Sequence, residues 1–250
     1  MLTHATSTWY DVASVNMAWT ETDFRLGRET MNTEAYSLER KWVQIGVIGG
    51  LIASITYPIV VVFGGGLPRI LTLILSAAFG PALAIGSAGV YYFFKAERET
   101  AAAQIGAVAN VVASAFVTGM VIVQLAISFP QLDHIARYGA DPAVETIVHW
   151  TWYVVLGLDV SFDVFLAIGT FCFALLMLKH PRYGKAFGIT GFLVAVPFLV
   201  GLKFYTFPYP PKDVGFTFWD PGPWTDIWYL AVTIQLWRSL KWFRLKTQTS

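Results

Sequence analysis

The chain has 250 residues, of which 56% are hydrophobic and only 13% are charged, and its formal net charge is +1. A soluble domain carries about 25% charged residues, so this composition, with a mean hydropathy of +0.56, excludes an ordinary soluble domain and predicts an integral membrane protein. The near-neutral charge excludes a nucleic-acid binder, and the single cysteine excludes a disulfide scaffold.

The first 41 residues contain no apolar run long enough to cross a bilayer, and we expect them to form a cytoplasmic amino-terminal segment. Residues 1–30 show little helical periodicity, whereas the patterned sequence begins near Glu34. A true start at Met31 is therefore an alternative to a start at Met1. Because no cleavable signal is visible, the first span is expected to act as an uncleaved insertion signal.

Six apolar runs of 18 to 32 residues follow, and a helix needs roughly 20 residues to cross a membrane core about 30 Å thick. The predicted spans are residues 42–63, 70–94, 104–128, 147–178, 186–207 and 226–243, and residues 244–250 form a basic cytoplasmic tail. The runs lack the strict alternation of a β-barrel. The sequence therefore predicts an all-α fold, an integral membrane bundle of six transmembrane helices within residues 42–243.

Lysine and arginine are distributed unevenly among the segments between these spans. Most of them lie before the first span, in the second and fourth loops and at the carboxyl terminus: Arg25, Arg28, Arg40, Lys41, Lys95, Arg98, Lys179, Arg182, Lys185, Arg238, Lys241, Arg244 and Lys246. The other three loops hold Arg69, Arg137 and Lys212, one each. Cytoplasmic loops are enriched in basic residues, so both termini are predicted to be cytoplasmic.

Small residues recur four positions apart within the first three spans, where they let helix backbones approach closely. These pairs are Gly46 and Gly50, Ala82 and Gly86, and Ala115 and Gly119. Two amides within spans, Asn110 and Gln235, are expected to join helices by hydrogen bonds.

Three charged residues remain inside the spans, where each costs about 2.5–3.5 kcal/mol at the bilayer centre and so needs a reason. Asp159 and Asp163 lie four residues apart on one face of the fourth span, and Lys203 lies at a similar depth in the fifth. The two spans are joined by a short loop and should be antiparallel neighbours. Two acids and one base leave a surplus carboxylate for a proton or a ligand.

The same face of the fourth span continues toward the outer loops through Trp152 and His149, and Asp226 begins the sixth span on that side. We therefore predict an outer-facing polar pocket. Its candidate binding or coupling residues are Asp159, Asp163, Lys203, His149, Asp226 and Trp152.

The sequence contains no familiar catalytic motif. Cys-x-x-Cys and His-Glu-x-x-His are absent, and Gly86-Ser87-Ala88-Gly89 has its serine out of place for a nucleophile elbow. Along a straight helix His149 lies about 15 Å from Asp159, too far to share one metal ion. No catalytic residue, metal site or cofactor is therefore predicted.

Three functions remain open. The first is a small membrane protein whose pocket binds or moves a small solute or proton. The second is a structural or sensory membrane partner subunit, or a homo-oligomer, in which a bridge from Lys203 to Asp159 or Asp163 only locks helix packing. The third is a membrane-embedded lipid-modifying enzyme. The expected surroundings are the lipid bilayer in every case.

Three stretches of the last hundred residues resemble a family of bacterial multi-pass membrane proteins with no assigned activity. They are Gly157–Asp163, Leu178–Gly184 and Phe204–Pro211. The resemblance implies a six-helix bundle in the bacterial cell inner membrane. It implies no activity and no functional residues.

Overall fold

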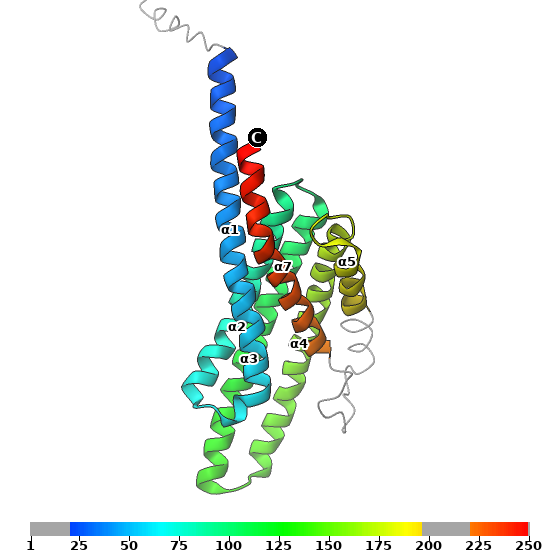
Figure 1. Cartoon of the computed structure of the whole chain (residues 1–250). Helices are drawn as coiled ribbons and strands as arrows, with labels where there is room; N and C mark the ends of the chain where they lie inside the picture. Colours follow the sequence, from blue (N-terminus) through cyan, green and yellow to red (C-terminus); the bar gives the residue numbers. More distant parts are fainter. Residues whose placement is uncertain (1–20, 197–220, 250) are drawn as a thin grey trace, which may run out of the picture. The chain divides into compact units, whose positions relative to one another are not determined.

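The computed structural model describes residues 21–196 and 221–249, which are almost entirely helical and contain no strand (Figure 1). The helices are α1 (Glu21–Phe63), α2 (Arg69–Lys95), α3 (Ala101–Tyr138), α4 (Pro142–Met177), α5 (Gly184–Leu193) and α7 (Pro221–Thr249), with a 3-10 turn, η1 (Gly64–Gly66), after α1. The chain divides into two units, residues 1–37 and 38–250. Helices α2 to α7 belong to the second unit, together with α1 from Leu38 onward.

Four helical segments are long and apolar enough to cross a membrane: Ser37–Gly66, Arg69–Lys95, Ala101–Tyr138 and Pro142–Met177. They contain the first three predicted spans and all of the fourth except its last residue, Leu178. The apolar stretch Gly184–Val196 is shorter, and the rest of the predicted fifth span, with Lys203, lies outside the described residues. The predicted all-helical class is thus confirmed for the described residues, and the apolar helices indicate a membrane location.

Helices α3 and α4 form a long antiparallel hairpin on which α2 and α5 pack. The hairpin turns sharply because Gly139 ends α3 at a φ of +82°, a conformation that favours glycine. Asp141 then caps α4 by accepting a hydrogen bond from the Ala143 backbone N–H at 2.8 Å, and Pro142 occupies the first helical position. These three residues make both helices longer than the predicted spans, and the hairpin extends past the α1–α2 turn (Figure 1).

Helices α1 and α2 approach closely at glycines. A Cβ atom added to Gly46 would lie 2.3 Å from the Cα of Gly89, and one added to Gly86 would lie 3.0 Å from the Cα of Gly50. The predicted close approach at Gly46, Gly50 and Gly86 is therefore confirmed. On α3 the expectation differs from the structure, because a Cβ at Gly119 would meet no described atom within 4 Å.

A buried hydrogen-bond network joins α3, α4 and α7. The Tyr229 hydroxyl donates to the Asn110 side-chain oxygen at 3.1 Å, and the Thr170 hydroxyl lies 3.1 Å from the Tyr229 hydroxyl. Because the single phenolic proton goes to Asn110, Thr170 is the donor to Tyr229. Gly169 leaves the space that Asn110 fills. Asn110 thus joins helices as predicted, whereas Gln235 of α7 donates to the backbone carbonyl of Arg182, which lies in the loop between α4 and α5.

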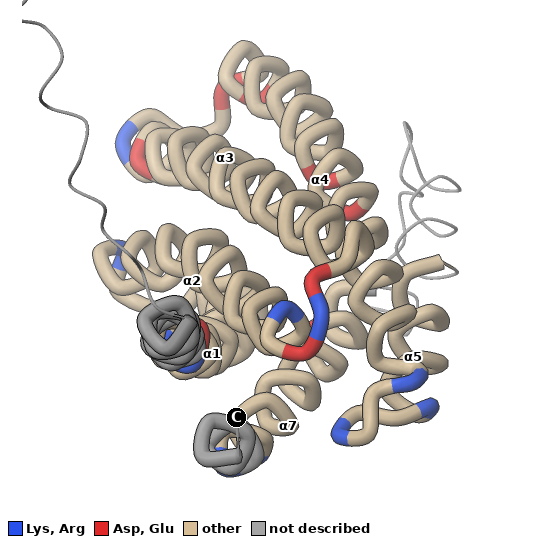
Figure 2. Tube along the Cα trace, turned by 90° about the horizontal axis from the view of Figure 1, so that it is seen from above, with Lys and Arg blue, Asp and Glu red and all other residues tan. Residues whose placement is uncertain are grey.

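The α2–α3 and α4–α5 loops lie at one end of the bundle, called here the basic end, where lysines and arginines gather (Figure 2). His180 is buried there against Phe93 and Phe94. Its Nδ1 accepts a hydrogen bond from the Arg182 backbone N–H at 3.1 Å, and its Nε2 lies 3.2 Å from Oε2 of Glu97. An accepting Nδ1 places the ring proton on Nε2, facing the carboxylate. This contact ties the two loops together.

Glu99 in the α2–α3 loop also fixes the start of α3. Its Oε1 accepts hydrogen bonds from the Gln104 amide and the Tyr91 hydroxyl, each at 2.9 Å. These two bonds, the stronger one from Gln104, hold the pKa of the Glu99 carboxyl below its ordinary value of 4.5. The loop therefore prefers the ionised form of Glu99.

Candidate functional site

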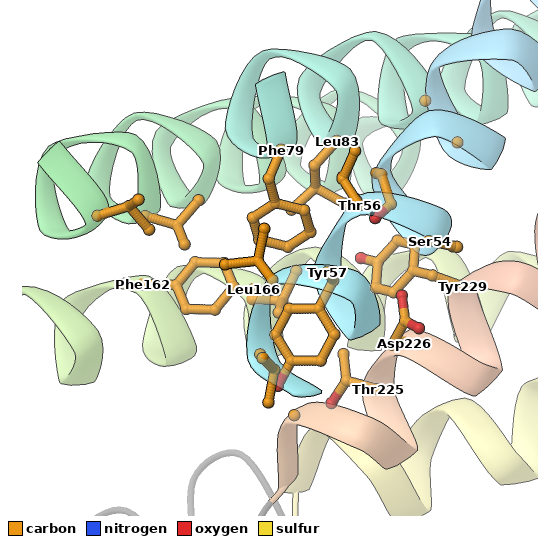
Figure 3. Close-up of a pocket in the computed structure, with 18 of the residues that line it drawn as sticks. Ser54, Thr56, Tyr57, Phe79, Leu83, Phe162, Leu166, Thr225, Asp226 and Tyr229 are labelled. Carbon is orange, nitrogen blue, oxygen red and sulfur yellow. Dashed lines mark hydrogen bonds between the residues drawn. The ribbon is translucent and has the colours of Figure 1, made fainter. Parts of the chain in front are cut away.

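A pocket of about 320 Å³ lies between α1, α2, α3, α4 and α7 (Figure 3). Its lining comes from residues 50–61 of α1, 76–90 of α2, 117–124 of α3, 159–166 of α4 and 222–233 of α7. On α1 these residues lie toward the α1–α2 turn, and on α7 they lie at its start. The pocket therefore lies in the middle of the bundle and extends toward the end opposite the basic end.

Three carboxyl groups line this pocket: Asp159, Asp163 and Asp226. Asp163 is 3% exposed, and Asp159 and Asp226 are half-buried. Asp226 lies beside the hydroxyl of Ser54 (Figure 3). Among the described lining residues there is no lysine, arginine or histidine. The pocket is therefore strongly acidic in composition, in a part of the bundle where an isolated charge is costly.

Hydroxyl groups and the amide of Gln124 form the rest of the polar lining, and two of the hydroxyls are unsatisfied. Thr56 and Thr233 donate to carbonyls of their own helices at 2.8 Å, the usual arrangement for a helical threonine. The Ser76 and Ser87 hydroxyls are buried and have no hydrogen-bond partner among the described residues. A buried hydroxyl without a partner costs about 1–3 kcal/mol. The two serine hydroxyls on α2 therefore keep hydrogen-bonding capacity that no described residue uses.

The remaining walls are apolar and aromatic. Tyr57 and Phe79 lie side by side with ring centroids 5.5 Å apart, and Phe162 and Leu166 of α4 lie across the pocket from Asp226 (Figure 3). Aromatic faces attract cations as well as apolar groups. The site thus combines acidic groups with a hydrophobic surface.

The structure brings together Asp159, Asp163 and Asp226, three of the six residues that the sequence singles out. His149 and Trp152 are exposed nearer the start of α4 and do not line the pocket. His149 packs against Tyr153 with ring centroids 5.2 Å apart. His149 and Trp152 lie about two to three helical turns before Asp159, closer to the α3–α4 turn. Lys203 lies outside the described residues.

The sequence analysis did not identify the hydroxyl-bearing residues of the site. Ser54, Thr56 and Tyr57 on α1, with Ser76 and Ser87 on α2, sit in long apolar runs and look like ordinary neutral helix residues. Within the described residues no three histidine, cysteine, aspartate or glutamate side chains lie together in a way that could hold a metal ion.

Comparison of the chain with protein-family models, curated protein sequences and solved structures returned no match. The resemblance to bacterial multi-pass membrane proteins therefore stays a prediction. The function has to be argued from the pocket itself.

Proposed function

We propose that the chain is a multi-pass membrane protein that binds a small cationic solute in the pocket formed by Asp159, Asp163 and Asp226. The observation that carries the proposal is the meeting of three carboxyl groups in one cavity with no basic side chain among its described lining residues. Carboxylates in a medium of low dielectric constant strongly favour a positive partner over a neutral or negative one. Pairing of one carboxylate with Lys203, as the sequence predicts, would still leave the pocket with an excess of acid.

The shape and walls of the cavity favour an organic cation over a proton alone. A volume of about 320 Å³ lies at the lower end of the range for small-molecule sites, about 300–1,000 Å³. The aromatic walls at Tyr57, Phe79 and Phe162 suit the carbon skeleton of an amine, and their faces suit its charge. The unsatisfied hydroxyls of Ser76 and Ser87 can accept hydrogen bonds from an ammonium group.

The finer topology is part of the same proposal. We infer six membrane spans, with both termini on the side of the basic end, and a location in a bacterial inner membrane. The proposal is supported by the long helix α7, which contains the predicted sixth span, and by the basic residues of the α2–α3 and α4–α5 loops. In this topology the acidic pocket opens toward the outer side.

The proposal is tested with benzylamine and its neutral counterpart benzyl alcohol, which have similar shape but differ in charge near neutral pH. Benzylamine at ten times its dissociation constant should stabilise the purified full chain by about 1.4 kcal/mol. This corresponds to a rise of about 3–5 °C in the midpoint of thermal unfolding. Benzyl alcohol should give no such rise, and neither compound should stabilise Asp226→Asn.

Glu145→Gln is the matched control, because Glu145 is an exposed carboxylate on α4 that does not line the pocket. This variant should respond to benzylamine like the unmodified chain. Equal stabilisation by amine and alcohol, or a lost response in Glu145→Gln, would contradict a cation site at these carboxylates.

The structural alternative makes a different prediction for Asp163. A cation pocket predicts that Asp163→Asn accumulates as folded membrane protein but no longer responds to benzylamine. A purely structural bridge predicts that Asp163→Asn fails to fold and that Lys203→Met in the same chain restores folding.

A further inference from the structure

A second groove lies at the basic end of the bundle, between α1 and α7. Its volume is about 580 Å³, and it is lined by Arg40, Gln44, Ile234, Trp237, Arg238, Leu240 and Lys241. Three of these residues carry a positive charge, and no carboxylate is among the described lining residues. The groove therefore has the opposite charge character to the acidic pocket and attracts an anion.

Arg40 gives the groove a specific hydrogen-bonding requirement. Its Nε atom is buried and makes no hydrogen bond within the described residues. A buried donor of this kind needs an acceptor, and the planar guanidinium matches two oxygens of a phosphate group particularly well. Gln44, one turn farther along α1, adds an amide donor.

The α7 side of the groove changes from apolar to cationic along the helix. Ile234, Arg238 and Lys241 lie at positions i, i+4 and i+7, hence on one face. Along the axis of α7, Ile234 lies about 10 Å farther from the basic end than Lys241 does. Trp237 stands between these levels and is exposed, as is typical of a tryptophan at a membrane–water interface. A cationic rim above an apolar floor matches the headgroup and acyl chain of one lipid molecule.

We propose that this groove binds an anionic phospholipid, with its phosphate group between Arg40, Arg238 and Lys241 and its acyl chain against Ile234. The phosphodiester satisfies the Arg40 donor and places one negative charge among the three positive charges. The apolar floor adds contacts that a free phosphate ion lacks. Basic grooves between helices at the interface are a known mode of recognition for anionic headgroups.

The test is native mass spectrometry of the full chain in mild detergent, titrated with dioctanoyl phosphatidylglycerol. The zwitterionic dioctanoyl phosphatidylcholine and inorganic phosphate serve as competing ligands. The variant Arg238→Gln/Lys241→Gln removes two exposed groove cations, and Lys179→Gln/Lys185→Gln removes two exposed cations from the same end but outside the groove.

Phosphatidylglycerol should bind the unmodified chain about tenfold more tightly than phosphatidylcholine and should resist an excess of inorganic phosphate. The groove variant should lose about tenfold in affinity, and the control variant should lose little. Displacement by inorganic phosphate would show a free-anion site and overturn the lipid assignment. Equal weakening in the two variants would overturn it as well, because it would show attraction to the general surface charge.

Discussion

The Tyr229 hydroxyl donates a hydrogen bond to the side-chain oxygen of Asn110 at 3.1 Å, although 119 residues separate the two in the sequence. Asn110 is fully buried on α3, and Tyr229 both joins this network and lines the acidic pocket. The bond therefore ties the wall of the pocket to the centre of the bundle. It makes the position of α7, and with it Asp226, depend on an amide in another helix.

Gly169→Ala should destabilise the bundle by about 1–3 kcal/mol, because the new methyl group would lie 2.0 Å from the Asn110 oxygen. Gly157→Ala on the same helix is the control, since its methyl group would meet no described atom within 4 Å. The control should be neutral or slightly stabilising, as alanine favours the helix. Thermal unfolding in detergent measures both variants. Asn110→Ala in the Gly169→Ala chain should recover part of the loss, and an additive loss would contradict the proposed clash.

Ser87→Ala should separate the stability of the chain from its ligand affinity. Removing an unsatisfied buried hydroxyl should leave the free chain unchanged or up to about 1 kcal/mol more stable. If the hydroxyl contacts the occupant, benzylamine affinity should fall, by about tenfold for a bond to a charged group. Thermal unfolding without ligand and a benzylamine titration give the two values. A destabilised free chain with normal affinity would show that Ser87 serves packing instead.

Gly89→Ala should separate α1 from α2, because its methyl group would lie 2.5 Å from the Cα of Gly46. Backbone atoms cannot move aside as a flexible side chain can, so a loss of about 1–3 kcal/mol is expected. Gly119→Ala on α3 has open space and should be tolerated. The midpoint of thermal unfolding distinguishes the two variants. Equal tolerance of both would contradict the close helix contact.

The Glu99 contact should depend on pH in the manner of a carboxylate with a lowered pKa. Its stabilising effect should be complete above the ordinary pKa of 4.5 and should disappear as the pH falls through the lower pKa of the folded chain. Comparing the unfolding midpoints of the unmodified chain and Glu99→Gln across this range measures the effect. Removing the donor with Gln104→Ala should raise the carboxyl titration midpoint. If the Glu99 carboxyl of the unmodified chain titrates with a pKa at or above 4.5, the hydrogen-bond geometry is contradicted.

The sequence was sufficient for the features that depend on one helix at a time. Long apolar runs predicted the helical class, and the spacing of Asp159 and Asp163 placed both on one face that reaches the pocket. The spacing of Gly46 and Gly50 likewise marked a close helix contact. Each of these patterns depends on residue spacing within one helix, so it can be recognised from the sequence of that helix alone.

Features that depend on which helices meet could not be predicted in the same way. Nothing local distinguishes Gly119, which faces open space, from Gly89, which touches a backbone. The hydroxyls of Ser76 and Ser87 matter only because α2 lies beside α1 and α4 at the cavity. Gly139, Asp141 and Pro142 form a local signal for the end of α3 and the start of α4, which hydrophobicity alone does not mark.

The most direct test of the acidic pocket is chemical labelling of its carboxyl groups with dicyclohexylcarbodiimide, which reacts with carboxyl groups within membranes, mapped by peptide mass spectrometry. Bound benzyltrimethylammonium, a cation with no N–H group to react with the activated carboxyl groups, should reduce the labelling of Asp226, and any labelling of Asp159 and Asp163, while benzyl alcohol should not. Labelling of Glu145 outside the pocket should stay unchanged. Equal protection by both compounds, or unaltered labelling of Asp226 at saturating benzyltrimethylammonium, would contradict a cation site formed by these three carboxyl groups.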